Sequence, residues 1–150
     1  MPKILLSVPH RQQKHDGECL PACIAMVLVY IGKPISDKKL LKILKTSEYG
    51  TPSDNILFLE NLGFDVTCTS SNMTELESLI NQNYPVIVGV RTGELPYWKY
   101  DTPHAVLVVG YDDTQIYLND PDRIEHPIAV SKDDFELAWL ARYYYCAFIR

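Results

Sequence analysis

The segment CLPACIAMVLVY, residues 19–30, constrains the fold most because it has no charged residue and is apolar nearly all round. Its length and the following Gly32 predict a helix that ends at that glycine. A helix that is apolar on every side has to be buried. The apolar run is far shorter than the ~20 residues that a membrane span needs. We therefore expect a globular fold in which the rest of the chain covers this helix.

Helical patterns dominate the first half of the chain. Beyond residues 19–30 we predict helices at 36–44, 51–63 and 74–80, and an alternating strand at 64–69. Ser36 is a typical capping residue for the first of these helices.

The second half has the pattern of a sheet. We predict strands at 86–90, 105–109, 116–118, 127–130 and 143–149, with one helix at 131–139. Helices followed by a mainly antiparallel sheet indicate an α+β fold. Because no repeat or flexible linker interrupts the sequence, we expect residues 1–150 to form a single domain.

Charge and cysteine content exclude several classes of protein. Fourteen Lys and Arg against nineteen Asp and Glu give a net charge of −5, without the basic stripe of a nucleic-acid-binding protein. The acidity weakly favours basic or neutral peptides as ligands. Residues 1–8 lack the features of a signal peptide. We expect a cytoplasmic protein with no membrane or nucleic-acid partner. Its thiols are expected to be free, because four cysteines are too few for a disulfide scaffold: Cys19, Cys23, Cys68 and Cys146.

Cys19 is the candidate nucleophile. Its thiol belongs at the N-terminus of the buried helix, where the helix dipole and unpaired N–H groups favour the thiolate. Pro21 supports this placement, since proline is tolerated in the first helical turn. Most cysteines are simply small buried hydrophobes, and we interpret Cys23 in that way.

Three other residues can complete a catalytic set. His104 stands at the head of an apolar strand and can act as base, although an inert strand-end histidine is an equally common reading. Asp120 follows the next strand and can orient His104 if the strands are neighbours, although Asp-Pro is also a plain turn signal. Gln13 can donate to an oxyanion together with the Cys19 N–H, although isolated glutamines usually lie at the surface.

These residues occur in an order that resembles the double-glycine-leader (bacteriocin-processing) peptidases. The chain resembles that family over nearly its whole length, in the segments Gln13-x5-Cys19-x-Pro21-Ala22, TPHAVLVVGYD at 102–112, and LNDP at 118–121. The resemblance implies a papain-like fold with Cys19 as nucleophile, His104 as base, Asp120 as orienting residue and Gln13 in the oxyanion hole. It implies a peptide or protein substrate and no cofactor.

The sequence departs from the family's pattern in two ways. Leu20 stands where family members usually have glycine, and a side chain there is expected to narrow the cleft. The membrane and ATPase domains of leader-processing exporters do not follow, so we do not expect export within the same polypeptide.

The leading hypothesis is a cysteine peptidase that works through a thioester intermediate. The same triad can also perform deamidation or transpeptidation. A second hypothesis is a papain-like module that binds a peptide or leader without cleaving it, because some relatives lack the cysteine and serve as binding domains. In either case Tyr97, Trp98 and Tyr100 can form an aromatic wall of the cleft or pack on their own domain.

A zinc site is the third hypothesis. It would draw on His10, His15, Cys19 and Cys23, but their spacing fits no compact structural zinc pattern. We read His10, His15 and His126 as solvated loop residues. A regulatory partner, if there is one, is not identified by the sequence.

Overall fold

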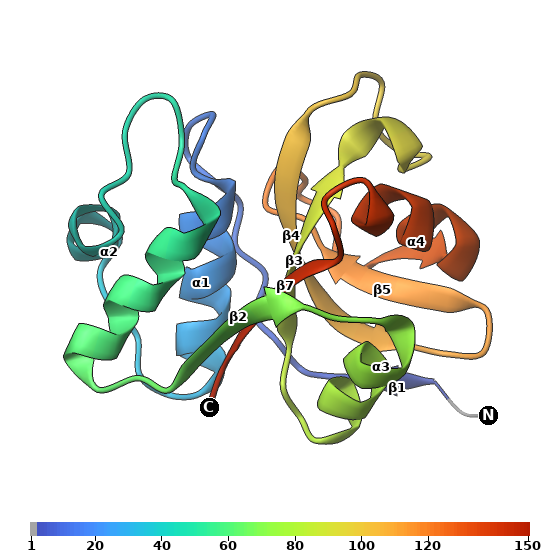
Figure 1. The fold of residues 1–150 in the computed structure, drawn as a ribbon, viewed down its shortest axis with the longest axis horizontal. Helices are drawn as coiled ribbons and strands as arrows, with labels where there is room; N and C mark the ends of the chain where they lie inside the picture. Colours follow the sequence, from blue (N-terminus) through green and yellow to red (C-terminus); the bar gives the residue numbers. More distant parts are fainter. Residues whose placement is uncertain (1–2) are drawn as a thin grey trace.

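The computed structural model describes residues 3–150 as two groups of elements that meet along one long helix. Figure 1 shows α1 beside α2 and the green helix η1 on one side, and the sheet with α3 and α4 on the other. The helices are α1 Cys19–Tyr30, α2 Asp37–Ile43, η1 Ser53–Leu62, α3 Met73–Asn81, η2 Thr92–Glu94 and α4 Lys132–Leu140. The α+β arrangement predicted from the sequence is confirmed.

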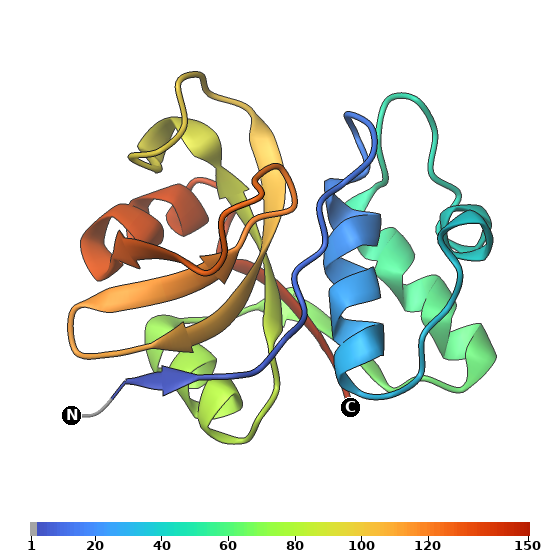
Figure 2. The same cartoon turned by 180° about the vertical axis from the view of Figure 1, so that it is seen from behind.

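Seven strands in residues 3–150 form one sheet, and all of their pairings are antiparallel. They are β1 Ile4–Leu5, β2 Val66–Ser70, β3 Val86–Arg91, β4 Pro103–Tyr111, β5 Gln115–Asn119, β6 Ile128–Ser131 and β7 Tyr145–Ile149. The order across the sheet is β2-β7-β3-β4-β5-β6, and β1 pairs with β4. Figure 2 shows the N-terminal segment passing from β1 along the sheet to α1.

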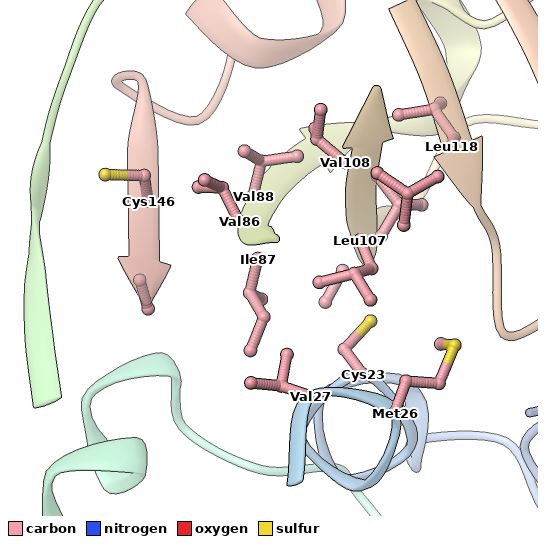
Figure 3. Close-up of a cluster of buried hydrophobic side chains, with 14 of the residues drawn as sticks. Cys23, Met26, Val27, Val86, Ile87, Val88, Leu107, Val108, Leu118 and Cys146 are labelled. Carbon is pink, nitrogen blue, oxygen red and sulfur yellow. The ribbon is translucent and has the colours of Figure 1, made fainter. Parts of the chain in front are cut away.

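Helix α1 is buried as its composition predicts. Every residue from Leu20 to Leu28 is buried, and Cys23, Met26 and Val27 face the sheet (Figure 3). Their partners include Leu107 of β4. Since burying one large aliphatic side chain contributes roughly 1.5–3 kcal/mol, this contact fixes α1 firmly against the sheet.

Two elements differ from the sequence predictions. The segment 53–62 is a 3₁₀ helix, not an α-helix, and buries Ile56 and Leu59. A three-residue period puts that pair on one face, which suffices to cover the core there. Strand β7 begins at Tyr145 because Tyr143 and Tyr144 both have φ of 56° and form a turn.

The register of β4 and β5 sets the position of the candidate site. Leu107 pairs with Asn119, so the residue after β5 lies near the beginning of β4. The neighbouring strands that the sequence interpretation required for His104 and Asp120 are therefore present. No helix within residues 3–150 is long and apolar enough to cross a membrane.

Candidate active site

Cys19 is the first residue of α1 and is partly exposed. The preceding loop is held close to a second turn: a Cβ on Gly17 would lie 3.1 Å from backbone atoms of Gly50. Gly17 also has φ of +82°, so glycine is required there on both counts. This close approach fixes the entry to the helix and thereby the direction of the thiol.

The Cys19 thiol and the His104 side chain line the same cleft and interact electrostatically. Burial raises the pKa of the thiol, but the hydrogen bond to His104 and its charge lower it. Backbone hydrogen bonds from Ala105 and Leu20 also lower this pKa, which lies below its ordinary value of 9.0 as a result. The surroundings of Cys19 favour the thiolate, which is the nucleophilic form.

His104 lies near the beginning of β4, opposite Val90 of β3, and is only 7% exposed. Burial lowers its pKa, but hydrogen bonds to Asp120 and Cys19 and the charges of both raise it, to about 9 from 6.5. The pKa values of thiol and imidazole therefore shift in opposite directions. Both shifts favour a thiolate–imidazolium pair.

Asp120 is fully buried directly after β5, and its side-chain carboxylate accepts four hydrogen bonds. Its Oδ1 is 2.7 Å from His104 Nε2 and 2.9 Å from the backbone N of Asp122. Burial raises the pKa of this carboxyl, but the hydrogen bond and charge of His104, with hydrogen bonds from Tyr97 and the Asp122 N–H, lower it, and the net shift is downward. Because Nε2 is held by Asp120, the other ring nitrogen of His104 is left for the thiol.

Tyr97 and Trp98 hold the second oxygen of this carboxylate, a role that the sequence reasoning missed. Tyr97 Oη donates to Asp120 Oδ2 at 2.6 Å, and Trp98 Nε1 donates at 3.0 Å. Arg123 in turn lies 4.8 Å from the centre of the Trp98 ring and donates to the Tyr97 carbonyl. The expected aromatic wall is partly present, since Trp98 and Tyr100 also line the cleft. A hint in the sequence was a Tyr-Trp pair shortly before His104.

Gln13 lies at the same cleft as Cys19 and His104. Its backbone N donates to Pro121 O at 2.7 Å, which ties it to the Asp120 segment. The amide Nε2 donates to His15 O at 3.1 Å, using one of its two hydrogens. Its Oε1 is buried without a hydrogen-bond partner. The structure thus brings Gln13 beside the thiol, with its amide turned toward its own loop.

Two hollows adjoin the Cys19–His104 pair. The smaller has a volume of about 190 Å³ and the larger about 410 Å³. They share five lining residues, namely Gly17, Cys19, Tyr49, Pro103 and His104. A ligand can therefore extend to either side of the thiol, as an extended peptide must do to present an internal bond to a nucleophile.

Leu20 and Cys23 have different surroundings from Cys19. Leu20 is 4% exposed and belongs to the core, although it also lines the smaller hollow. Leu20 therefore narrows the cleft less than expected, because most of its side chain is buried in the core. Cys23 is fully buried, and burial raises its thiol pKa well above 9.0, which disfavours a thiolate there.

Two of the three histidines predicted to be solvated loop residues, His10 and His126, have ring contacts, while His15 is exposed as predicted. His10 Nε2 is 2.9 Å from Asp120 O, and its ring stacks on His126 at 4.5 Å between centroids. Within residues 3–150, no three His, Cys, Asp or Glu side chains gather closely enough to hold a metal ion.

The sequence model of a family described as "Peptidase_C39 like family" matches residues 5–147. No protein with curated annotation matches the sequence.

Three solved structures of similar fold are described as peptidases or proteases. A protein from Bacillus anthracis described as a C39-like peptidase has a TM-score of 0.85 and 21% identity, covering 100% of this chain and 98% of its own. The peptidase domain of Streptococcus ComA, a bi-functional ABC transporter, has a TM-score of 0.75 and 26% identity, with 97% of both chains covered.

The third is a double glycine motif protease from an AMS/PCAT transporter, solved in complex with the leader peptide. Its TM-score is 0.76 at 20% identity, covering 97% of this chain and 92% of its own. At 20–21% identity, this structure and the Bacillus anthracis structure show a shared fold. That fold is the papain-like one expected from the sequence.

Proposed function

Since the chain belongs to the C39-like peptidase family, we propose that it is a cysteine peptidase that cleaves a peptide or protein substrate. In this proposal Cys19 is the nucleophile, His104 the general base and acid, and Asp120 the orienting residue. The observation that carries it is the buried His104–Asp120 hydrogen bond beside the Cys19 thiol, whose pKa His104 lowers, at the junction of two hollows.

The proposed acylation step starts from the Cys19 thiolate and the His104 imidazolium. The Cys19 thiolate attacks the scissile carbonyl carbon, a C–S bond forms and an electron pair moves onto oxygen. As this oxyanion collapses, the C–N bond breaks and the proton on His104 passes to the leaving nitrogen. Asp120 keeps the imidazole ring in place and stabilises its charge throughout.

Deacylation reverses the proton's path. Water adds to the thioester carbonyl and gives a proton to His104, now neutral. The C–S bond then breaks, releasing a carboxylic acid and returning the thiolate–imidazolium pair. The buried Asp120, with its four donors, does not need to change protonation in either step.

Gln13 is proposed as an oxyanion donor together with the Cys19 backbone N–H. The second hydrogen of Gln13 Nε2 is not used in its bond to His15 O, and the side chain lines the larger hollow beside the thiol. A preorganised donor of this kind acts only when negative charge develops on the substrate oxygen.

We also propose that the partner is a peptide and that the protein works in a reducing compartment. One structural neighbour holds a leader peptide, and the two hollows here offer room on both sides of a scissile bond. A nucleophilic thiol requires a compartment that keeps it reduced, and all four cysteines are free. The proposal therefore includes a cytoplasmic location. It also treats residues 1–150 as a single domain.

Alkylation by iodoacetamide tests the nucleophile directly. The native protein is treated at several pH values and each cysteine is quantified by peptide mass spectrometry. We expect Cys19 to react rapidly at pH 6, and His104→Ala to abolish that reactivity, while ordinary thiols react only as pH approaches ~8.5. Cys68 serves as an internal control, because burial raises its pKa.

A substrate assay completes the test. Cys19→Ala is expected to remove all hydrolysis while the melting temperature stays unchanged, with Cys68→Ala as the matched active control. Hydrolysis that persists in Cys19→Ala would disprove the proposed mechanism. A Cys19 that reacts no faster than an ordinary thiol would favour a peptide-binding module instead.

A further inference from the structure

The smaller hollow beside Cys19 contains a cation that the proposed mechanism does not use. Of the described residues that line this hollow, Arg142 is the one with a permanent charge. The other lining side chains are mainly small, aromatic or hydroxyl-bearing, such as Thr51, Ser53 and Tyr145. A ligand group in this hollow therefore meets a positive charge next to the reactive thiol.

The backbone at Arg142 is held firmly. Its N–H donates to Trp139 O at 3.0 Å and its carbonyl accepts from Tyr145 N at 3.1 Å, closing the turn between α4 and β7. Tyr144 N also donates to Trp139 O, at 3.1 Å. The Arg142 side chain therefore extends from a turn whose backbone is fixed by hydrogen bonds.

The guanidinium has no acidic partner within the part of the chain that the structure describes. No carboxylate among residues 3–150 lies within 4.0 Å of Arg142, whereas Arg11, Arg91 and Arg123 each have one. Its one side-chain hydrogen bond is to Ser53 Oγ, at 3.5 Å. A partly buried guanidinium with unused donors is suited to bind a carboxylate through two parallel hydrogen bonds.

Gly89 lines the smaller hollow between Arg142 and the Cys19–His104 pair, and it has no side chain to fill that space. Gly89 of β3 pairs with Ala105 of β4, the neighbour of His104. A Cβ at Gly89 would stand 3.3 Å from the Tyr145 ring and 3.6 Å from the Arg142 Cβ. Because that Cβ is missing, the hollow continues from His104 to the base of Arg142.

The larger hollow has the opposite charge. Asp16 and Asp122 line it, and no lysine or arginine of the described residues does. Asp122 is partly neutralised by Arg123 at 3.3 Å, which leaves Asp16 as the freer carboxylate. A peptide lying across the thiol thus passes from a positive end to a negative end, and this polarity favours one direction of binding.

We propose that the smaller hollow is a subsite for an acidic side chain of the substrate, with Arg142 as the residue that determines this specificity. The inference rests on the proposed function and adds the substrate class. It differs from the expectation, drawn from the net charge of −5, that basic or neutral peptides are preferred. At a subsite the nearest charge outweighs the net charge, because exposed charges beyond about 10 Å are largely screened.

A peptide pool provides the first test. The enzyme digests a mixture of proteome-derived peptides, and mass spectrometry aligns the products on the cut bond. We expect Glu and Asp to be enriched at one fixed position on one side of the bond. A synthetic pair differing only by Glu or Gln at that position should then differ about 10- to 100-fold in kcat/KM.

Three variants assign the preference to Arg142. Arg142→Met should reduce the Glu peptide to the rate of the Gln peptide, and Arg142→Glu should reverse the preference toward Lys. Arg150→Met is the matched control: it removes the same charge from the far end of β7 and should keep the Glu preference. Iodoacetamide labelling of Cys19 at pH 6 shows that each variant retains its folded site.

The outcomes separate this inference from the proposed function. Cleavage with no preference for acidic residues, or a preference that survives Arg142→Met, overturns the subsite and leaves the peptidase standing. If no peptide in the pool is cut, the proposed function fails, and the inference fails with it.

Discussion

The Trp98 ring lies against the His104 ring, with centroids 4.9 Å apart and planes inclined by 58°. The same indole donates its N–H to the carboxylate that holds His104. One side chain therefore covers the His104–Asp120 hydrogen bond and also completes it. Shielding from water strengthens such a bond, because electrostatic interactions are stronger where the dielectric is low.

Trp98→Phe is expected to lower kcat about tenfold, a loss typical of one charge-assisted hydrogen bond. The phenyl ring keeps much of the packing but leaves Asp120 with one donor fewer. The pKa of Asp120 should rise as a result toward the acidic limb that Cys19 sets, so that limb should move to higher pH. A pH–rate profile measures this, with Tyr84→Phe as an aromatic control outside the cleft. A profile that stays in place would show that Trp98 does not act through Asp120.

Asp120→Ala is expected to cost stability as well as activity. The variant leaves the His104, Tyr97 and Trp98 donors without their buried acceptor, at about 1–3 kcal/mol for each donor that finds no water. Urea denaturation should show a lower free energy of unfolding, and hydrolysis should fall at least 100-fold. Asp120→Asn keeps one acceptor oxygen and should recover part of the stability. Equal stability of all three proteins would contradict the network described here.

Activity should follow a bell-shaped curve against pH. The rising limb reports deprotonation of Cys19, at a pH below 9.0 because its pKa is lowered. The falling limb should lie near pH 9, where His104 loses the proton that the leaving nitrogen requires. The kcat/KM of one peptide, measured from pH 4 to 10.5, gives both limbs. Activity that rises only above pH 9 would show that the ion pair does not form.

The sequence predicted the site better than it predicted the connections around it. The sequence singles out three residues because each lies at the end of an element with a strong apolar pattern, namely Cys19, His104 and Asp120. These residues come together once α1 packs on β4 and β4 pairs with β5. Gln13 has no such pattern, and its amide orientation is set by a local contact with His15.

The features of the site that the sequence did not predict depend on contacts between residues far apart in the chain. The donors from Tyr97 and Trp98 to Asp120 bridge 23 and 22 positions, respectively, and come from a loop without periodicity. Arg142 reaches the cleft because a turn with two left-handed tyrosines ends α4, where the sequence suggested a strand from residue 143. Such turns follow from tertiary packing, which overrides local preference.

Gly110→Ala is expected to destabilise the edge of the sheet. A Cβ at this position would overlap the Ile4 carbonyl oxygen, so β1 could not keep its pairing with β4. We expect a loss of about 1–3 kcal/mol in the free energy of unfolding, measured by urea denaturation. Gly93→Ala is the comparison: its Cβ would stand 2.9 Å from the exposed Asp101 side chain, which can turn away at the cost of its contacts with Arg91 and the Gly93 N–H, so a smaller loss is expected. An unchanged denaturation midpoint for Gly110→Ala would mean that β1 is not paired as described.

Gln13→Ala separates oxyanion stabilisation from nucleophile activation. Peptide hydrolysis passes through an oxyanion, so the loss of this donor should lower kcat by about 10²–10³. Alkylation of Cys19 by iodoacetamide develops no such oxyanion, so its rate at pH 6 should be unchanged. Gln12→Ala is the matched control, because Gln12 is exposed and faces a different hollow, near Arg11 and Asp37. If alkylation slows as much as hydrolysis does, Gln13 acts on the thiol itself and the oxyanion role is wrong.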